Sequence, residues 1–209
     1  MEYWTTHSPF RSLRIFGPED SWLFFGRDRD TDELLARLGR APTLAVIGNS
    51  GSGKSSLIQA GLIPALRRGR FRNDGRWVDS WRVAVFRPSA APFDYLAEAL
   101  PGQLKPELSP EEHVDFIGVC KKKLPEGGET LRNAIVGPLN PRHPTSGDAR
   151  ILLVVDQFEE VFTLVDDKTT RELYINSLWL PHAWMVRFRC TWYWRCGRTS
   201  MRIAWIIQS

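Results

Sequence analysis

The chain has 209 residues, of which 43% are hydrophobic and 25% charged. This is the balance of an ordinary globular protein of about one domain, and it excludes a disordered or fibrous chain. The apolar runs, such as residues 151–155, fall far short of the roughly 20 residues of a transmembrane helix, and no secretory signal opens the chain. The three cysteines form no Cys-x-x-Cys pair, which suits a reducing compartment. We therefore expect a cytoplasmic protein without a membrane partner.

The net charge of +4 is concentrated near the end of the chain. No acidic residue follows Glu172, whereas five arginines do: Arg187, Arg189, Arg195, Arg198 and Arg202. A nucleic-acid interface needs clustered phosphate contacts, and the best candidate is the group of arginines at 67–72. These arginines follow a predicted helix, whose C-terminus favours cations, so we predict no nucleic-acid site.

The first predicted elements are an aromatic lead segment, a helix and a strand. Residues 1–28 are rich in aromatic and turn-forming residues. Residues 30–38 are predicted to be helical, because Asp30 and Glu33 have the spacing of a capping box. The apolar run at 43–47 is typical of a strand buried on both faces.

Further along, a glycine-rich loop at 48–53 precedes a helix that is predicted to kink at Pro64 and to end near Gly69. The other predicted elements are a strand at 81–86, a helix at 93–100, one or two helices within 101–150 before a polar loop at 137–147, a strand at 151–155 and a helix at 168–179. Strands that alternate with helices favour right-handed βαβ units. We therefore predict an α/β protein whose parallel sheet has helices on both faces, as in P-loop NTPases.

Residues 179–209 differ in composition from the rest of the chain. They hold five of the nine tryptophans and no carboxylate. Apolar residues alternate with polar ones from Val186 to Trp194, which suits an edge strand, whereas a central parallel strand should be continuously apolar. Either this is an unusual amphipathic end, or the reading frame shifts near residue 178, and we favour the shift. The predicted domains are thus 1–28, 29–178 and a basic, tryptophan-rich tail at 179–209.

The loop after the first strand fits the P-loop (Walker A) pattern G-x-x-x-x-G-K-[ST]. Its candidate nucleotide-binding residues are Gly48, Asn49, Ser50, Gly51, Ser52, Gly53, Lys54, Ser55 and Ser56. In such a loop, backbone N–H groups and a helix N-terminus surround the phosphates. Lys54 would reach the β- and γ-phosphates, and the Ser55 hydroxyl would bind Mg²⁺. The alternative is a glycine-rich turn without a ligand.

The strand at 151–155 ends at Asp156, in the position of a Walker B carboxylate that would bind Mg²⁺ directly or through water. Many ATPases place a glutamate directly after this Asp, but here the residue is Gln157, which cannot act as a base. Glu159 or Glu160 is a candidate to position or deprotonate the attacking water. The alternative is that both are solvated loop carboxylates. In either case we expect slow turnover.

Together these segments resemble the novel STAND NTPase domain, a group of signal-transduction ATPases related to the AAA+ and NACHT groups. The resemblance covers roughly residues 8–178 and rests on the lead motif Phe24-Phe25-Gly26-Arg27-Asp28, the loop at 48–58 and the run from Leu152 to Phe162. It implies an ATP/ADP switch with Mg²⁺, association of copies in the ATP state, and regulation of a fused effector that the resemblance does not identify. It also implies that the lead segment packs on the nucleotide site, with Phe25, Gly26 and Arg27 at the adenine end; the alternative is that both phenylalanines are core residues.

A departure from the family's pattern keeps other functions open. The family has an apolar strand ending in arginine after Walker B, expected here near 183–193, and it is not recognisable. We therefore predict a sheet that is incomplete at its C-terminal end, and an inert nucleotide-binding fragment is one alternative. An ABC-type ATPase is another, although the Leu-Ser-Gly-Gly-Gln signature that it needs is absent from residues 90–150.

Overall fold

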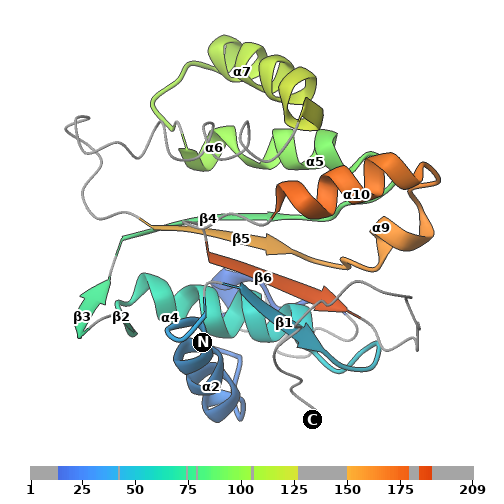
Figure 1. Ribbon diagram of the computed structural model, residues 1–209. Helices are drawn as coiled ribbons and strands as arrows, with labels where there is room; N and C mark the ends of the chain where they lie inside the picture. The colour runs from blue at the N-terminus through green and yellow to red at the C-terminus, as the bar shows by residue number, and fades with distance from the viewer. Residues whose placement is uncertain are drawn as a thin grey trace.

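The computed structural model is a mixed α/β structure built on a small parallel sheet (Figure 1). The structure describes residues 14–41, 43–73, 75–78, 80–104, 106–126 and 150–178, together with the backbone of 184–189. The sheet has the strand order β1-β6-β5-β4, and every neighbouring pair in it is parallel. Its strands are β1 (Thr43–Ile47), β4 (Trp81–Phe86), β5 (Arg150–Val155) and β6 (Trp184–Arg189).

Helices cover both faces of this sheet (Figure 1). One face carries α5 (Pro92–Ala99), α6 (Pro101–Leu104), α7 (Pro110–Lys123), η3 (Leu124–Glu126) and α10 (Lys168–Ser177). The other face carries α2 (Asp28–Leu38), α3 (Lys54–Ser56), η2 (Leu57–Leu62) and α4 (Ile63–Arg67). Two short helices, η1 (Pro18–Asp20) and α9 (Glu160–Thr163), complete the described elements of this kind. This layering confirms the predicted α/β class.

The side chains of β5 show why its sequence is continuously apolar. Ile151, Leu153 and Val155 lie in the core cluster with α5 and α10, whereas Leu152 and Val154 lie in the cluster with α2 and α4. All five are no more than 2% exposed. A strand covered on both faces needs apolar residues in both alternating sets, and this confirms the prediction for 151–155.

The bounds of α2 and α10 differ from the predictions, and α5 is shifted by one residue from the predicted 93–100. The helix α2 begins at Asp28 and has Arg27 as its N-cap, without a side-chain cap. Asp30 pairs instead with Arg27, and Glu33 pairs with Arg37 one turn later. The predicted capping box is therefore wrong, because charged neighbours within the helix bind both carboxylates. The last helix ends at Ser177 rather than 179, while the loop predicted at 137–147 lies outside the described residues.

The helix after the loop is continuous from Lys54 to Arg67 but changes its winding. A π-helical stretch, η2, precedes Pro64. Proline has no N–H to donate to the preceding turn, so the predicted disturbance takes the form of wider turns just before it. The helix ends as predicted: Gly69 has φ +70°, and Arg70 N–H donates to Ala65 O at 3.0 Å in a Schellman-type end.

An antiparallel hairpin absent from the predicted elements follows, formed by β2 (Phe71–Asn73) and β3 (Arg76–Val78). The arginines around it make contacts within the chain. Arg68 donates to Ser21 Oγ at 2.9 Å, and Arg70 pairs with Asp32. Arg72 lies 5.7 Å from the centre of the Trp77 ring.

The strand β6 corrects the prediction for the end of the chain. Its backbone lies between β1 and β5, with Thr43 opposite Met185 and Val155 opposite Arg187. The prediction of an edge strand is therefore wrong, as is the prediction of a sheet that lacks its strand near 183–193. The physical reason is that strand pairing uses backbone N–H and C=O groups, which every residue here supplies. The alternation of apolar and polar residues in a strand indicates only which of its two faces is buried, not which strands lie beside it.

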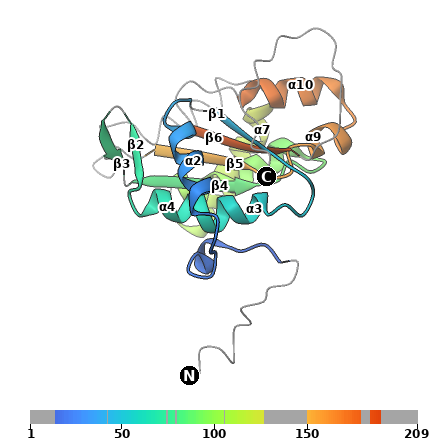
Figure 2. The same cartoon turned by 90° about the horizontal axis from the view of Figure 1, so that it is seen from below.

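The described part of the lead segment lies against the helical layer formed by α3 and η2 (Figure 2). Phe16 N–H donates to Ser56 Oγ at 3.2 Å, and the Phe16 and Phe24 rings are 5.9 Å apart. Phe24 also packs against the core cluster beneath α2 and α4. Within the described part of the chain, no helix is long and apolar enough to span a bilayer.

Candidate functional site

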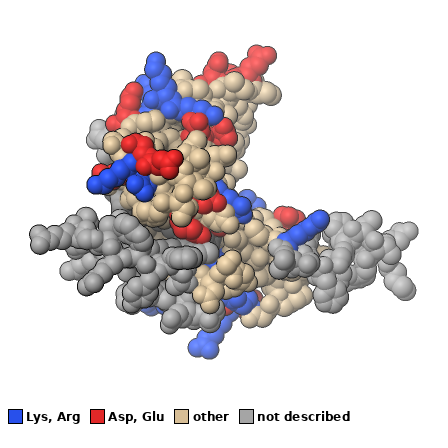
Figure 3. All heavy atoms as spheres, turned by 90° about the vertical axis from the view of Figure 1, so that its right-hand side faces the viewer, with Lys and Arg blue, Asp and Glu red and all other residues tan. Residues whose placement is uncertain are grey.

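The candidate site lies at the edge of the sheet where the parallel strands end. Gly48 follows β1, Asp156 follows β5, and Arg87 follows β4. Because the carboxyl ends of parallel strands share one edge, these residues come together although they are far apart in sequence. The space-filling view from this side shows acidic and basic side chains interspersed, rather than gathered by sign (Figure 3).

The loop between β1 and α3 has the backbone shape that its glycines permit. Gly51 and Gly53 have φ of +77° and +79°, a conformation that other residues adopt only with strain. Asn49, Ser50 and Gly51 are exposed, whereas Ser52 is half-buried. The helix that follows begins at Lys54, directly after Gly53, so its N-terminus lies next to the loop.

Lys54 folds back over this loop. Its Nζ donates to the carbonyl oxygens of Gly48 at 2.9 Å and Asn49 at 2.8 Å. The ammonium group is therefore held at the mouth of the loop by two neutral acceptors. A phosphate that enters the loop would offer Lys54 a stronger, charged acceptor.

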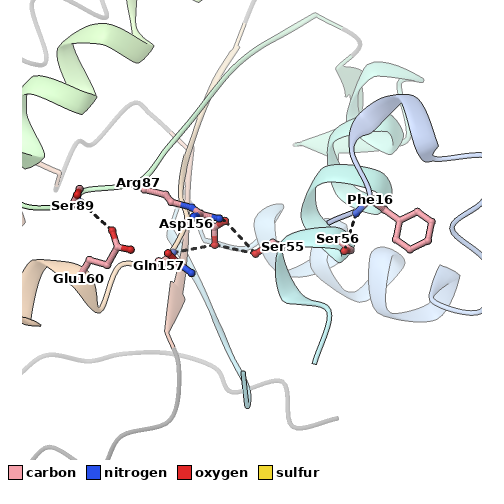
Figure 4. Close-up of polar contacts among 8 residues, drawn as sticks. All are labelled: Phe16, Ser55, Ser56, Arg87, Ser89, Asp156, Gln157 and Glu160. Atoms are coloured by element: carbon pink, nitrogen blue, oxygen red, sulfur yellow. Dashed lines mark hydrogen bonds and ion pairs between the residues drawn. The ribbon is translucent and has the colours of Figure 1, made fainter. Parts of the chain in front are cut away.

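Ser55 connects the loop to the end of β5. Its hydroxyl donates to Asp156 Oδ1 at 3.0 Å and is 3.2 Å from Oδ2, although the two residues are 101 positions apart in sequence. Asp156 is 4% exposed, and its Oδ1 also accepts from Gln157 N–H at 3.0 Å (Figure 4). Ser56 points elsewhere, because it is buried beside Phe16. The structure thus brings together the two residues predicted to bind metal.

The geometry of this pair suits a small, hard cation. Mg²⁺ binds oxygen ligands in an octahedron at roughly 2.0–2.1 Å, which places neighbouring ligands about 2.9 Å apart. The separation of 3.0 Å between Ser55 Oγ and Asp156 Oδ1 is close to this spacing. Within the described ranges, no group of three or more His, Cys, Asp or Glu side chains surrounds a metal site. Phosphate and water oxygens would therefore have to complete the coordination.

Arg87 is a member of the site that the sequence analysis misses. One terminal nitrogen of its guanidinium lies 3.5 Å from Asp156 Oδ2, and the side chain is 48% exposed. The available signal was its position directly after an apolar strand, which places it at the ligand-binding edge of a parallel sheet. A lone arginine after a strand has no motif around it, and the pairing of β4 with β5 is not visible in the sequence.

The two candidate catalytic glutamates have different surroundings. Glu160 Oε2 accepts from Ser89 N–H at 3.1 Å, on the side of Asp156 away from Ser55 (Figure 4). Glu159 Oε2 is buried and has no hydrogen-bond partner among the described residues. Between these carboxylates and Asp156, Gln157 has φ +52°. Glu160 therefore connects two loops, whereas Glu159 keeps an unused acceptor.

The two phenylalanines of the lead motif differ in burial, and only Phe25 is predicted to lie at the adenine end with Gly26 and Arg27. Phe24 is half-buried against the core, but Phe25 is 78% exposed. The alternative that both phenylalanines are core residues is therefore wrong for Phe25. Gly26 has φ +81°, and Arg27 donates from a terminal nitrogen to Ser52 O at 3.4 Å. The motif is thus attached to the glycine-rich loop through Arg27.

These features define an α/β protein with a glycine-rich loop and a buried acidic residue side by side at the edge of a parallel sheet. The family model of novel STAND NTPase 1 matches residues 9–196. The chain belongs to the novel STAND NTPase 1 family. The match confirms the predicted resemblance and continues past residue 178 through β6. A comparison with curated proteins finds no match.

Proposed function

We propose that this chain is an ATP/ADP-binding switch module of the STAND type, with Mg²⁺-dependent and slow ATP hydrolysis. The observation that carries the proposal is the hydrogen bond between Ser55 and Asp156. It unites the end of the glycine-rich loop with a carboxylate 101 positions away, at a spacing that suits Mg²⁺. Membership of an NTPase family supports the same assignment.

In this proposal each part of the site has a separate task. The backbone N–H groups of residues 48–53 and the N-terminus of the helix that begins at Lys54 bind the phosphates. Lys54 exchanges its two carbonyl acceptors for phosphate oxygens. Ser55 and Asp156 hold Mg²⁺, which neutralises charge on the phosphates when bound. Phe25 and Arg27 contact the base end, since Phe25 presents an exposed aromatic face and Arg27 is attached to the loop.

The surroundings of the carboxylates support slow hydrolysis. Gln157 can orient a water molecule but cannot accept its proton. Of the two glutamates, Glu159 is the better candidate for the base, because its buried Oε2 has no partner among the described residues. Glu160 already binds the Ser89 backbone. Slow hydrolysis suits a switch, in which the lifetime of the ATP state is the signal.

The family also supports a role in signal transduction. A switch of this kind would regulate an effector according to the bound nucleotide, and copies of the chain would associate in the ATP state. Such coupling requires that ATP and ADP stabilise two different conformations.

Binding of a fluorescent ATP analogue, with Mg²⁺ and with EDTA, tests this function. Lys54→Ala should abolish binding, because no other side chain of the loop carries a positive charge. Asp156→Ala should retain weak binding but lose its dependence on Mg²⁺. Lys121→Ala is a matched control, since Lys121 pairs with Glu98 on the surface of α7 and should not affect binding. Retained Mg²⁺-dependent binding in both site variants would refute the proposal.

A further inference from the structure

In the described part of the site, Asp156 forms an ion pair with Arg87, which no predicted motif includes. The backbone of Arg87 is fixed on both sides. Asp156 N–H donates to Phe86 O at 2.9 Å, and Ser89 N–H donates to Glu160 Oε2 at 3.1 Å. Ser89 itself has φ +49°. The loop between these two bonds is therefore held in place, and only the long side chain of Arg87 is free to change direction.

The pair between Arg87 and Asp156 is weak. Its single contact is 3.5 Å long, and the arginine is 48% exposed, so solvent screens it. Asp156 already accepts hydrogen bonds from Ser55 and from Gln157 N–H. The arginine thus adds a positive charge beside Oδ2, whose other contact is the Ser55 hydroxyl at 3.2 Å.

Mg²⁺ at Asp156 would change this balance. A divalent cation beside the carboxylate repels the guanidinium and supplies the charge that Arg87 now provides. Arg87 then needs another anionic partner within reach of its side chain. In a P-loop site the metal joins the β- and γ-phosphates, so the oxygens near Asp156 belong to the terminal end of the nucleotide rather than to the base.

We propose that Arg87 reads the terminal phosphate: it pairs with Asp156 when the site has no metal and moves to the γ-phosphate when Mg²⁺ and ATP bind. ADP has no such phosphate, so Arg87 contributes to the preference for ATP over ADP. Guanidinium groups suit this role because they bind phosphate oxygens through two parallel hydrogen bonds. The inference rests on the proposed nucleotide-binding function and adds a specificity-determining residue to it.

The test compares ATP and ADP affinities of the full chain, using fluorescent analogues with Mg²⁺ and with EDTA. Arg87→Gln should lower the affinity for ATP with Mg²⁺ roughly tenfold, as expected for one charge-assisted contact. Its affinity for ADP should change by less than about twofold, and in EDTA the effect on ATP should shrink to the same level. Arg87→Lys should restore part of the loss. Arg70→Gln is the matched control, because it removes a half-exposed arginine paired with Asp32 beyond the other end of the helix.

The outcomes separate this inference from the proposed function. If the wild-type chain binds neither nucleotide, the proposed function fails and the role of Arg87 fails with it. If the wild type binds both and Arg87→Gln leaves the ATP/ADP ratio unchanged, only the role of Arg87 is overturned. If Arg87→Gln lowers the ATP affinity equally in EDTA, the proposed movement of the Arg87 side chain from Asp156 to the γ-phosphate is overturned. A Tm of Arg87→Gln equal to that of the wild type verifies that the variant is folded.

Discussion

Gly61 is the position where the helix after the loop packs most closely against the lead segment and α2. A Cβ added there would lie 2.7 Å from Thr31 Oγ1, 3.4 Å from Leu57 Cδ1 and 3.5 Å from Phe24 Cε1. Thr31 cannot move aside easily, because it is 4% exposed and its hydroxyl donates to Arg27 O at 3.0 Å. We therefore expect Gly61→Ala to destabilise the protein, although alanine is the better helix former.

The magnitude follows from a comparison with Gly118 on α7, where an added Cβ would have no atom within 4 Å. Gly118→Ala should increase the free energy of unfolding by about 0.5–1 kcal/mol. Gly61→Ala has the same intrinsic gain but also an overpacking cost of about 1–3 kcal/mol. It should therefore be about 2 kcal/mol less stable than Gly118→Ala, which for a chain of this length corresponds to a difference in Tm of roughly 4–8 °C.

Thermal and urea unfolding of the two variants measure this difference. The variant Thr31→Ala removes the oxygen that the new methyl group would meet. In that background, Gly61→Ala should cost at least about 1 kcal/mol less than in the wild type. If Gly61→Ala unfolds at or above the temperature of Gly118→Ala, the close packing of Thr31 in α2 against this helix is refuted.

Two further predictions concern the base end and pH. Phe25→Ala should weaken ATP and ADP binding equally and leave the Tm unchanged, because Phe25 is 78% exposed; unchanged affinity in nucleotide titrations would exclude its contact with the base. Asp167 caps α10, and hydrogen bonds from Thr170 lower the pKa of its carboxyl group. Its stabilising effect is therefore present at neutral pH and is lost as the pH falls through that lowered pKa. Asp167→Ala should unfold below the wild-type temperature at pH 7, with the difference vanishing in acid well below pH 4 or so. Asp166→Ala is the matched control, because it removes a neighbouring carboxylate that does not cap α10.

The parts of the fold that the sequence predicts are those with a strong local pattern. The glycine-rich loop needs positive φ angles and a lysine at a fixed spacing, and the structure has both at Gly53 and Lys54. The strand before Asp156 is apolar on both faces, and its residues divide between the two core clusters. These patterns are visible in the sequence because glycine permits the positive φ angles of the loop, and apolar residues are needed where helices cover both faces of a strand.

The parts that the sequence does not predict depend on contacts between distant segments. Arg87 joins the site only because β4 pairs with β5. The hairpin at 71–78 is not predicted from the sequence, because strands of three residues are too short to show an apolar alternation. Its one local signal is Gly75, which has the positive φ of a tight turn. The central position of β6 is not visible in the sequence, because backbone pairing with β1 and β5 does not require apolar side chains in β6. Whether the reading frame shifts near residue 178 stays a prediction, which the gene's DNA sequence across that region tests.

The strand order of the sheet leaves β1 without its pairing partner for much of the time that the chain is being synthesised on the ribosome. The strand β1 bonds to β6, which follows it by some 140 residues, and no other described strand borders β1. At a synthesis rate of about 5–20 residues per second, β1 waits roughly 7–30 s for its partner. During that time one edge of β1 and the apolar faces beside it have no native cover from β6. The nascent chain is therefore exposed to aggregation over this interval, and trigger-factor-like or other holding chaperones would have their greatest effect before residue 189 leaves the exit tunnel.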